Sequence, residues 1–472
     1  MKTPDARYDK LIAGEIWTSD EPYRNLEYFC DVIGSRWAGS DSEKKGGEFL
    51  KTRLEEYGLQ NVRLEPVAFG AWTRGHATLE ITSPEKKAFS CIAQPYCPAG
   101  DIKAELIDAG NGEAEDIEAL GDKVKGKIVL VAAETNTKGV RTTKLAHRTD
   151  KLRFAEDAGA LGVIYVNQNP GLLHITGGIA APGGKPAAIF GVGTSWEHGQ
   201  AIKRLIARSE GPITVKLSVG GTFEDDNTSY NVVAEIPGST HPDELVIAGA
   251  HYDGHDISQA ALDDGAGTMV TLEAARVLAT LPPEAIGRTI RFILFCGEEV
   301  GLFGSWAYTA DHEADVTKTA FMMNLDGAGQ GRGGKEKMTI SGRPELVPYF
   351  EDFSDQARYE FEIQDILGPH SDHYPFAIRG IPTVSVSHPD DSSSGVGRGW
   401  GHTEADTFDK ANLRGLQMSA MLAARILRHV ASDEDFPAGL KSGDELRDQL
   451  TELGLDTPLK RAGRWDLVGK TS

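Results

Sequence analysis

The chain has 472 residues, of which 40% are hydrophobic, so it exceeds one ordinary core and we expect two domains. Its formal net charge of -21 excludes the basic surface that nucleic-acid binding needs. No apolar run reaches the roughly 18 residues of a membrane-spanning helix. We therefore expect neither nucleic acid nor a membrane as a partner.

Four cysteines are present, and none belongs to a CxxC motif: Cys30, Cys91, Cys97 and Cys296. Zinc held by thiolates and a disulfide framework are both disfavoured, although a bond between Cys91 and Cys97 across a loop stays open. The N-terminal MKTPDARYDKLIAGEIW has neither the apolar core nor the cleavage site of a signal peptide. The chain as written is therefore predicted to be cytoplasmic. A secreted or periplasmic protein whose signal peptide had been removed would have the same kind of N-terminal sequence.

Helical spacing is clear near the N-terminus, where GGEFLKTRLEEYGL places Phe49, Leu50, Leu54 and Tyr57 on one face. From about residue 76 to 225 the pattern changes to short strands separated by glycine and proline, around one helix, DKLRFAEDAGA. We expect this stretch to form a smaller β-rich domain inserted into a larger one.

The larger domain resumes near SYNVVAEIPG. Strands are predicted near 230–236, 244–250, 289–296, 319–325 and 382–387, and helices near 265–280, 344–358 and 410–430. This alternation predicts an α/β fold with a mostly parallel sheet flanked by helices. The expected domains are 1–75 with 226–432, the insertion 76–225, and an appendage 433–472 that either docks or is loosely held.

The stretch VIAGAHYDGHDISQAALDDGAG has the pattern of a metal site. An apolar strand ends at His251, Asp253 follows, and the paired Asp263 and Asp264 stand where a helix should begin. An imidazole followed by carboxylates can bind divalent cations, and packing alone does not explain why such residues stand at the end of a buried strand. The alternative is that Asp263 caps the helix and His251 is a surface residue.

Ligand-type side chains recur downstream in the same strand-then-turn pattern. RFILFCGEE ends in Glu298 and Glu299, AFMMNLDG ends in Asp326, and GWGHTEADT supplies His402 from a glycine-rich loop. In open α/β sheets the crevice beyond the carboxyl ends of the strands binds ligands, so these residues can converge. Taken singly, each has an ordinary alternative. The glutamate pair could be acidic residues at a helix N-terminus, Asp326 could form a turn, and His402 could be a loop histidine. Together they predict one metal centre.

The order His-x-Asp, Asp-Asp-Gly-x-Gly, Gly-Glu-Glu-x-Gly, Asn-x-Asp and His-Thr-x-x-Asp-Thr resembles the co-catalytic two-zinc exopeptidases. That family includes bacterial aminopeptidases, glutamate carboxypeptidase II and carboxypeptidase Q, and the carboxypeptidase Q group is the most similar, through IGSRWAGSDSEKKGGEFLKTRLEEYGLQNVRLEPV and the spacing of HYDGHDISQAALDDGAG. KIVLV, the following helix and ALGVIYVN resemble a protease-associated domain, which would wall the cleft or only add stability. One departure is Leu262, where many family members have Asn.

The resemblance implies two zinc ions held by five side chains: His251, Asp263, Glu299, Asp326 and His402. It assigns Asp263 as the carboxylate that bridges the two ions. His251 and Asp326 would complete one ion, and Glu299 and His402 the other.

The resemblance also makes Glu298 the general base and Asp253 the orienting partner of His251. Two cations can share a water, lower its pKa and polarise a carbonyl, while a non-ligating carboxylate takes the proton. The implied activity is hydrolysis of the peptide bond at the end of short peptides, as an aminopeptidase or a dipeptidase.

Two further segments are candidates for substrate contact. SSSGVGRGWGH places Arg398 and Trp400 just before His402, and an arginine can grip a terminal carboxylate. SDHYPFAIRGIP, with Asp372 and His373, resembles a family segment near the cleft. The alternatives are a solvated loop arginine, and a Ser371 that caps a short helix.

Other functions remain open: a binding module that has kept the fold, or a deacylase or cyclase that uses one zinc ion. The complete ligand set and Glu298 favour an enzyme. We expect a short peptide as its partner and leave a homodimer open.

Overall fold

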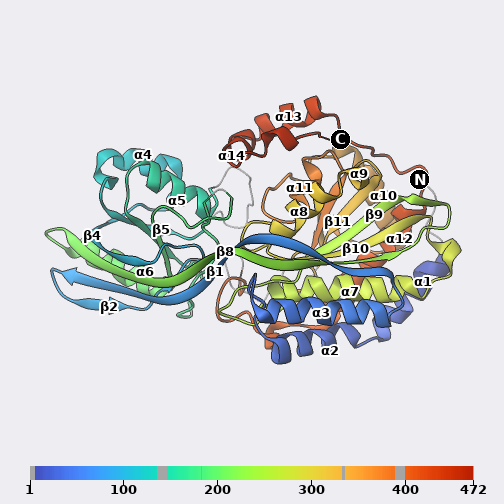
Figure 1. Ribbon diagram of the computed structural model, residues 1–472, viewed down its shortest axis with the longest axis horizontal. Helices are drawn as coiled ribbons and strands as arrows, with labels where there is room; N and C mark the ends of the chain where they lie inside the picture. Colours follow the sequence, from blue (N-terminus) through green and yellow to red (C-terminus); the bar gives the residue numbers. More distant parts are fainter. Residues whose placement is uncertain (1–5, 135–145, 182, 332–334, 389–398, 471–472) are drawn as a thin grey trace.

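The computed structural model describes residues 6–134, 146–181, 183–331, 335–388 and 399–470. Two lobes are joined by a long antiparallel pair of strands, β1 (Gln60–Ser83) and β8 (Ile213–Ile236), which run from one lobe into the other (Figure 1). The larger lobe contains both ends of the described chain, and the smaller lobe is built from the middle of the sequence.

The sheet of the larger lobe has the order β8-β10-β9-β11-β14-β12-β13. Its further strands are β9 (His241–His251), β10 (Arg288–Phe295), β11 (Thr319–Asn324), β12 (Lys337–Ile340), β13 (Glu362–Asp365) and β14 (Thr383–Ser387). The central neighbours β10-β9-β11-β14 are parallel, whereas β8 and β12 each join antiparallel. The predicted α/β fold with a mostly parallel sheet is confirmed.

Apolar residues on both faces of the central strands explain why helices cover both sides. In β8, Val232 and Ala234 belong to the main hydrophobic core, whereas Val233 between them packs into a second cluster with Tyr308 and Phe376. Because side chains alternate along a strand, a continuous apolar run buries both faces of the sheet.

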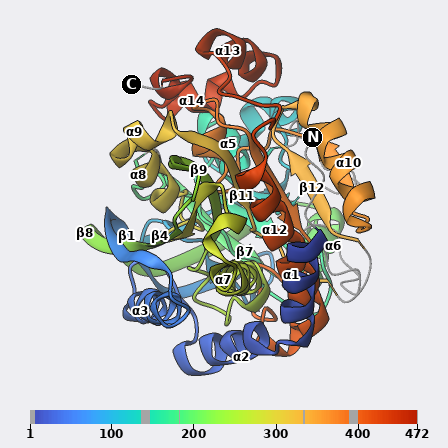
Figure 2. The same ribbon diagram turned by 90° about the vertical axis from the view of Figure 1, so that its right-hand side faces the viewer.

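The helices form two layers. In both views α2 (Glu21–Tyr28), α3 (Asp41–Glu56) and α7 (Ala266–Ala279) lie on one side of the sheet, and α8 (Phe303–Asp311) and α9 (Glu313–Val316) lie on the other (Figure 2). The remaining helices of this lobe are α1 (Ala6–Thr18), α10 (Val347–Ala357), α11 (Tyr374–Ala377) and α12 (Leu413–Ser432). Short 3-10 or π turns occur at Phe29–Ile33, Ala261–Gly265, Pro283–Ala285, Pro344–Leu346, Phe408–Lys410 and Trp465–Leu467.

The smaller lobe continues the sheet beyond β8 in the order β4-β5-β6-β7-β3. Its strands are β2 (Lys87–Phe89), β3 (Ile92–Ala93), β4 (Gly100–Asp108), β5 (Ile128–Ala132), β6 (Gly162–Val166) and β7 (Phe190–Thr194). Its helices are α4 (Ala114–Leu120), α5 (Arg148–Asp157) and α6 (Trp196–Arg208), with a 3-10 turn at Gly121–Val124. The expected β-rich character and the helix DKLRFAEDAGA are both present.

The C-terminal segment docks on the larger lobe through α13 (Gly443–Glu452) and α14 (Asp456–Arg461). Leu446, Leu450 and Leu459 are buried in a cluster with Trp306 and Tyr374 of the α8 and α11 region. Of the two sequence alternatives, docking is therefore what the structure shows.

All four cysteines are buried free thiols, so the alternative bond between Cys91 and Cys97 is not formed. Among the described helices, none combines the length and the apolarity required to cross a membrane.

Candidate metal centre

Neighbouring strand ends supply most of the predicted site residues. His251 is the last residue of β9, Glu298 and Glu299 lie in the turn after β10, and Asp326 follows β11. The register places His251 beside Phe295, the last residue of β10. Because the carboxyl ends of parallel strands meet at one edge of the sheet, side chains that are distant in sequence converge there.

Asp263 lies between two histidines from different loops. Its Oδ1 is 3.5 Å from Nε2 of His251, and its Oδ2 is 3.3 Å from Nε2 of His402. Asp406 holds the turn, because its carboxylate accepts the backbone N–H groups of Leu262 (2.7 Å) and Asp263 (3.1 Å). A carboxylate with one oxygen facing each histidine has the geometry of a bridge between two cations.

One half of the centre contains His251, Asp264 and Asp326, whose potential ligand atoms lie within 4.8 Å of one another. Ser371 donates a hydrogen bond of 2.7 Å to Oδ2 of Asp326, and Asn324 donates one of 2.7 Å to Ser371. Ser371 therefore orients Asp326 instead of capping α11, which is the alternative that the sequence left open.

The other half contains His255, Glu299 and His402. Oε2 of Glu299 lies 3.1 Å from Nε2 of His255 and 3.1 Å from Nε2 of His402. Nδ1 of His402 donates a hydrogen bond of 2.9 Å to the carbonyl of Thr176, a residue of the smaller lobe. That bond fixes the tautomer in which Nε2 offers its lone pair to a cation.

The sequence interpretation did not include His255, Asp406 or Ser371 as site residues. His255 stands in HYDGHD, two residues after Asp253, and is buried in the centre. Burial lowers the pKa of His255, which favours the neutral imidazole that binds metals. The only sequence signal for Asp406 was its place as the aspartate of the HTEADT motif.

The two adjacent glutamates face different surroundings. Glu299 is only 5% exposed, whereas Glu298 is partly exposed. Although burial opposes it, the positive charge that His255 and His402 carry in their protonated forms holds the pKa of Glu299 well below its ordinary value. Although Glu298 is partly exposed, the protein around it removes most water from its carboxylate. This desolvation, reinforced by the neighbouring carboxylates of Glu299 and Asp326, raises the pKa of Glu298 well above its ordinary value despite His251.

Asp253 holds the turn that carries both glutamates. Its carboxylate accepts the backbone N–H of Glu298 at 3.0 Å and that of Glu299 at 3.2 Å. Nδ1 of His251 donates to the backbone carbonyl of Asp253 at 3.2 Å and lies 3.5 Å from its carboxylate. One residue thus positions the imidazole and the glutamate pair together.

These residues fit divalent metal ions. Among the described residues, Nε2 of His251 and Oε1 of Glu299 are buried without a hydrogen-bond partner, which is costly unless a cation binds them. In Asp264, Oδ1 accepts the N–H groups of Gly267 and Gly327, whereas Oδ2 is likewise buried without a hydrogen-bond partner. Ligand atoms 3.1 to 3.5 Å apart match the edge of about 3.3 Å in a tetrahedron with zinc bonds of about 2.0 to 2.1 Å.

The candidate substrate contacts are less closely tied to the centre. Trp400 is partly exposed, and Nζ of Lys410 lies 5.5 Å from the centre of its ring. His373 is buried, with Nδ1 3.3 Å from Oγ of Ser385, and burial lowers its pKa to about 4. Arg398 lies outside the described residues. Contact of these three residues with substrate stays a prediction.

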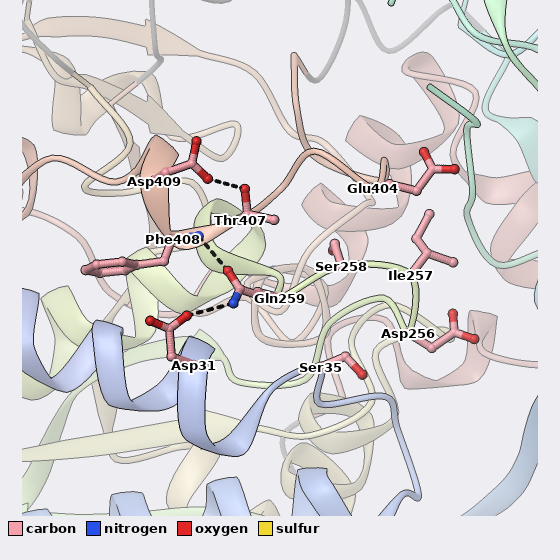
Figure 3. Close-up of a pocket in the computed structure, with 10 residues that line it drawn as sticks. All are labelled: Asp31, Ser35, Asp256, Ile257, Ser258, Gln259, Glu404, Thr407, Phe408 and Asp409. Carbon is pink, nitrogen blue, oxygen red and sulfur yellow. Dashed lines mark hydrogen bonds between the residues drawn. The ribbon is translucent and has the colours of Figure 1, made fainter. Parts of the chain in front are cut away.

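A pocket of about 710 Å³ lies between loops that also carry His255 and His402, and Figure 3 shows the residues that line it. It is lined by residues that follow His255 or His402 closely in the chain, together with two from the N-terminal region: Asp256, Ile257, Ser258, Gln259, Glu404, Thr407, Phe408, Asp409, Asp31 and Ser35. The smaller lobe reaches this region, because Arg74 pairs with Asp256 and His174 pairs with Glu404. None of the lining residues is a candidate ligand, so the pocket is not part of the metal centre.

Two parts of the chain match known protein families. Residues 231–427, which contain every candidate metal ligand, match peptidase family M28. This stretch of the chain is therefore similar to the peptidases of that family. Residues 94–202 match the PA domain, which agrees with the predicted protease-associated insertion.

Three relatives illustrate the similarity. Carboxypeptidase Q of Xenopus laevis is 27% identical over 324 residues, and the match covers 64% of this chain and 64% of that protein, which is less than two thirds of its length. The peptidase M28 precursor of Shewanella amazonensis SB2B has a TM-score of 0.79 at 25% identity, covering 92% of this chain and 98% of that one. A zinc aminopeptidase from Bacillus subtilis has a TM-score of 0.65 at 25% identity, covering 88% and 95%.

Proposed function

We propose that the chain is a zinc-dependent exopeptidase that hydrolyses the terminal peptide bond of short peptides, as an aminopeptidase or a dipeptidase. The placement of Asp263 carries the proposal, because one carboxylate faces His251 and His402 while Glu298 stands partly exposed nearby. Relatives named as a carboxypeptidase and as a zinc aminopeptidase support the same activity and the same metal.

Two zinc ions would be held by the predicted set: His251, Asp263, Glu299, Asp326 and His402. Asp263 would serve both ions, with His251 and Asp326 on one side and Glu299 and His402 on the other. When bound, two such ions lower the pKa of a shared water and polarise a carbonyl oxygen.

The protein itself supplies the proton transfer. Glu298 makes no predicted metal bond and stands partly exposed beside the ligand set, so its carboxylate suits a group that takes a proton from water and delivers it to the leaving amine. Asp253 positions that carboxylate through the backbone of the turn. Its contact with His251 ties the base to the ligand set.

Replacement of the base separates proton transfer from metal binding. Glu298→Gln should keep the metal content of the wild type and lose about 10² to 10⁴ in turnover. The matched control is Glu299→Gln, at the adjacent position, which should lose metal as well as activity. Activity of Glu298→Gln within a few-fold of wild type would rule out Glu298 as the base.

The class of substrate is tested with free and end-blocked dipeptides and tripeptides, whose products are identified by mass. We expect cleavage only at a free terminus, and the block that abolishes it identifies that terminus. A metal-loaded protein that cleaves none of them would instead support a binding module. Full activity with a single bound zinc would support the deacylase or cyclase alternative.

A further inference from the structure

His255 lies in the metal centre with no hydrogen bond to account for its burial. The side chain is 2% exposed, and neither ring nitrogen has a hydrogen-bond partner among the described residues. Nε2 lies 3.1 Å from Oε2 of Glu299, yet the pair does not meet hydrogen-bond geometry. Leaving a buried polar group unsatisfied is destabilising, so a partner is expected at this position.

The ring is held in one orientation by two neighbours. It stacks on Trp37, with ring centres 5.5 Å apart and planes 24° apart. It meets the ring of His402 edge-on, with centres 4.3 Å apart and planes 68° apart. The potential ligand atoms of His255, Glu299 and His402 all lie within 4.8 Å of one another.

The backbone around His255 is also fixed. Arg36 is fully buried and donates hydrogen bonds to the carbonyls of Tyr252 (2.7 Å), Gln259 (2.7 Å) and Ala260 (2.8 Å), which close the loop on both sides of His255. The next residue, Asp256, accepts two hydrogen bonds from Arg74, at 2.8 and 2.6 Å. Such pre-organisation is typical of a metal ligand, whose position must be set within a fraction of an ångström.

We propose that His255 is an additional protein ligand of the zinc ion that Glu299 and His402 hold, an inference that rests on the proposed function. With Asp263, that ion would have four protein donors and would bind the shared water as a fifth ligand, a coordination number that catalytic zinc can reach. The ion beside His251 and Asp326 would have three and would keep an open position. The two ions would therefore differ in affinity, and the one at His255 would be the tighter.

His255→Phe tests this proposal, because it keeps an aromatic ring on Trp37 and removes the donor atoms. Binding of two equivalents of Co²⁺ and Zn²⁺ to the chelated protein is followed by visible absorption and by competition with a chelator. We expect the affinity of one ion to fall by more than about 100-fold, the upper range for residues that only support a ligand, with a changed Co²⁺ spectrum. Thermal unfolding of the metal-free variant confirms that it folds.

Two further variants show whether loss of the ligand atoms causes the loss of metal affinity. His429→Phe replaces another buried histidine that stacks on an aromatic ring, Tyr349, far from the ligand set, and should bind both ions like wild type. His255→Asn keeps a hydrogen-bonding group beside Glu299 but is a poor zinc ligand, so it should not restore binding. Wild-type affinity in His255→Phe, or rescue by Asn, would overturn the proposal and leave the peptidase function standing. A wild-type protein that binds no metal would overturn both.

Discussion

Nδ1 of His402 donates its hydrogen bond to the carbonyl of Thr176, so a candidate metal ligand of the larger lobe is oriented by the smaller one. The contact is reciprocal, because the N–H of Thr176 donates to the carbonyl of His402 at 3.0 Å. Arg74 adds a third link, reaching Oγ of Thr176 at 3.1 Å. The inserted lobe therefore orients a candidate metal ligand of the larger lobe.

Gly178 offers a direct test of this contact between the lobes. A Cβ at this position would lie 2.9 Å from the backbone carbonyl of Glu299, closer than real Cβ contacts, so Gly178→Ala must displace the turn that carries a ligand. We expect metal affinity to fall by about 10- to 100-fold, the range for residues that support a ligand. Gly211→Ala is the control, because a Cβ there meets nothing within 4 Å. Unchanged affinity in Gly178→Ala would show that the centre tolerates movement between the lobes.

Asp263→Ala should remove both ions together. Its two oxygens face different histidines, His251 and His402, so no other side chain can replace both bonds. Asp326→Ala is the comparison, and we expect it to weaken only the ion beside His251. Elemental analysis of the dialysed proteins measures the ratio of zinc to chain. Full occupancy by two ions in Asp263→Ala would refute the bridge.

Docking of the C-terminal segment should contribute measurably to stability. Leu450 is fully buried against the α8 and α11 region, and Leu→Ala at such sites costs about 2 to 5 kcal/mol. We expect Leu450→Ala to accelerate amide hydrogen exchange throughout α13. Leu440, which is 38% exposed, is the control, and Leu440→Ala should leave the exchange unchanged. Equal exchange in both variants would mean that the segment is held by other contacts.

Much of the larger lobe was predictable because its strands are strongly marked. The runs before His251, Glu298 and Asp326 are apolar on both faces and stop at a polar residue, which indicates both a buried parallel strand and its end. By contrast, β12 and β13 are four-residue strands at the far side of the sheet, and α8 is a short helix rich in aromatic residues. Their existence depends on tertiary packing, which local pattern does not encode.

The candidate metal site was also predictable only in part. Ligand types at strand ends could be read from the sequence, but the place of His255 depends on a loop closed by Arg36, more than 200 residues away in the chain. Ser371 likewise reaches Asp326 only because β11 and the segment before α11 meet in the fold. Contacts of this kind, made between loops by buried polar groups, leave no periodic signal.

His373 should make the stability of the protein depend on pH. Burial lowers its pKa to about 4 in the folded state, whereas an unfolded histidine titrates near 6.5. The unfolded chain therefore takes up a proton that the folded protein excludes, so stability is fully present above about pH 6.5 and is lost as the pH falls toward 4. Between pH 7.5 and 5 this group should cost about 2 kcal/mol.

His373→Gln removes that titration while keeping a polar side chain beside Ser385. The free energy of unfolding of the variant should fall less between pH 7.5 and 5 than that of wild type, by about 2 kcal/mol, when both are measured by chemical denaturation. His76, which is exposed, provides the control, and His76→Gln should follow the wild-type dependence. If the stability of His373→Gln depends on pH as that of wild type does, the imidazole takes up a proton as readily in the folded protein as in the unfolded chain, as a residue open to the cleft would.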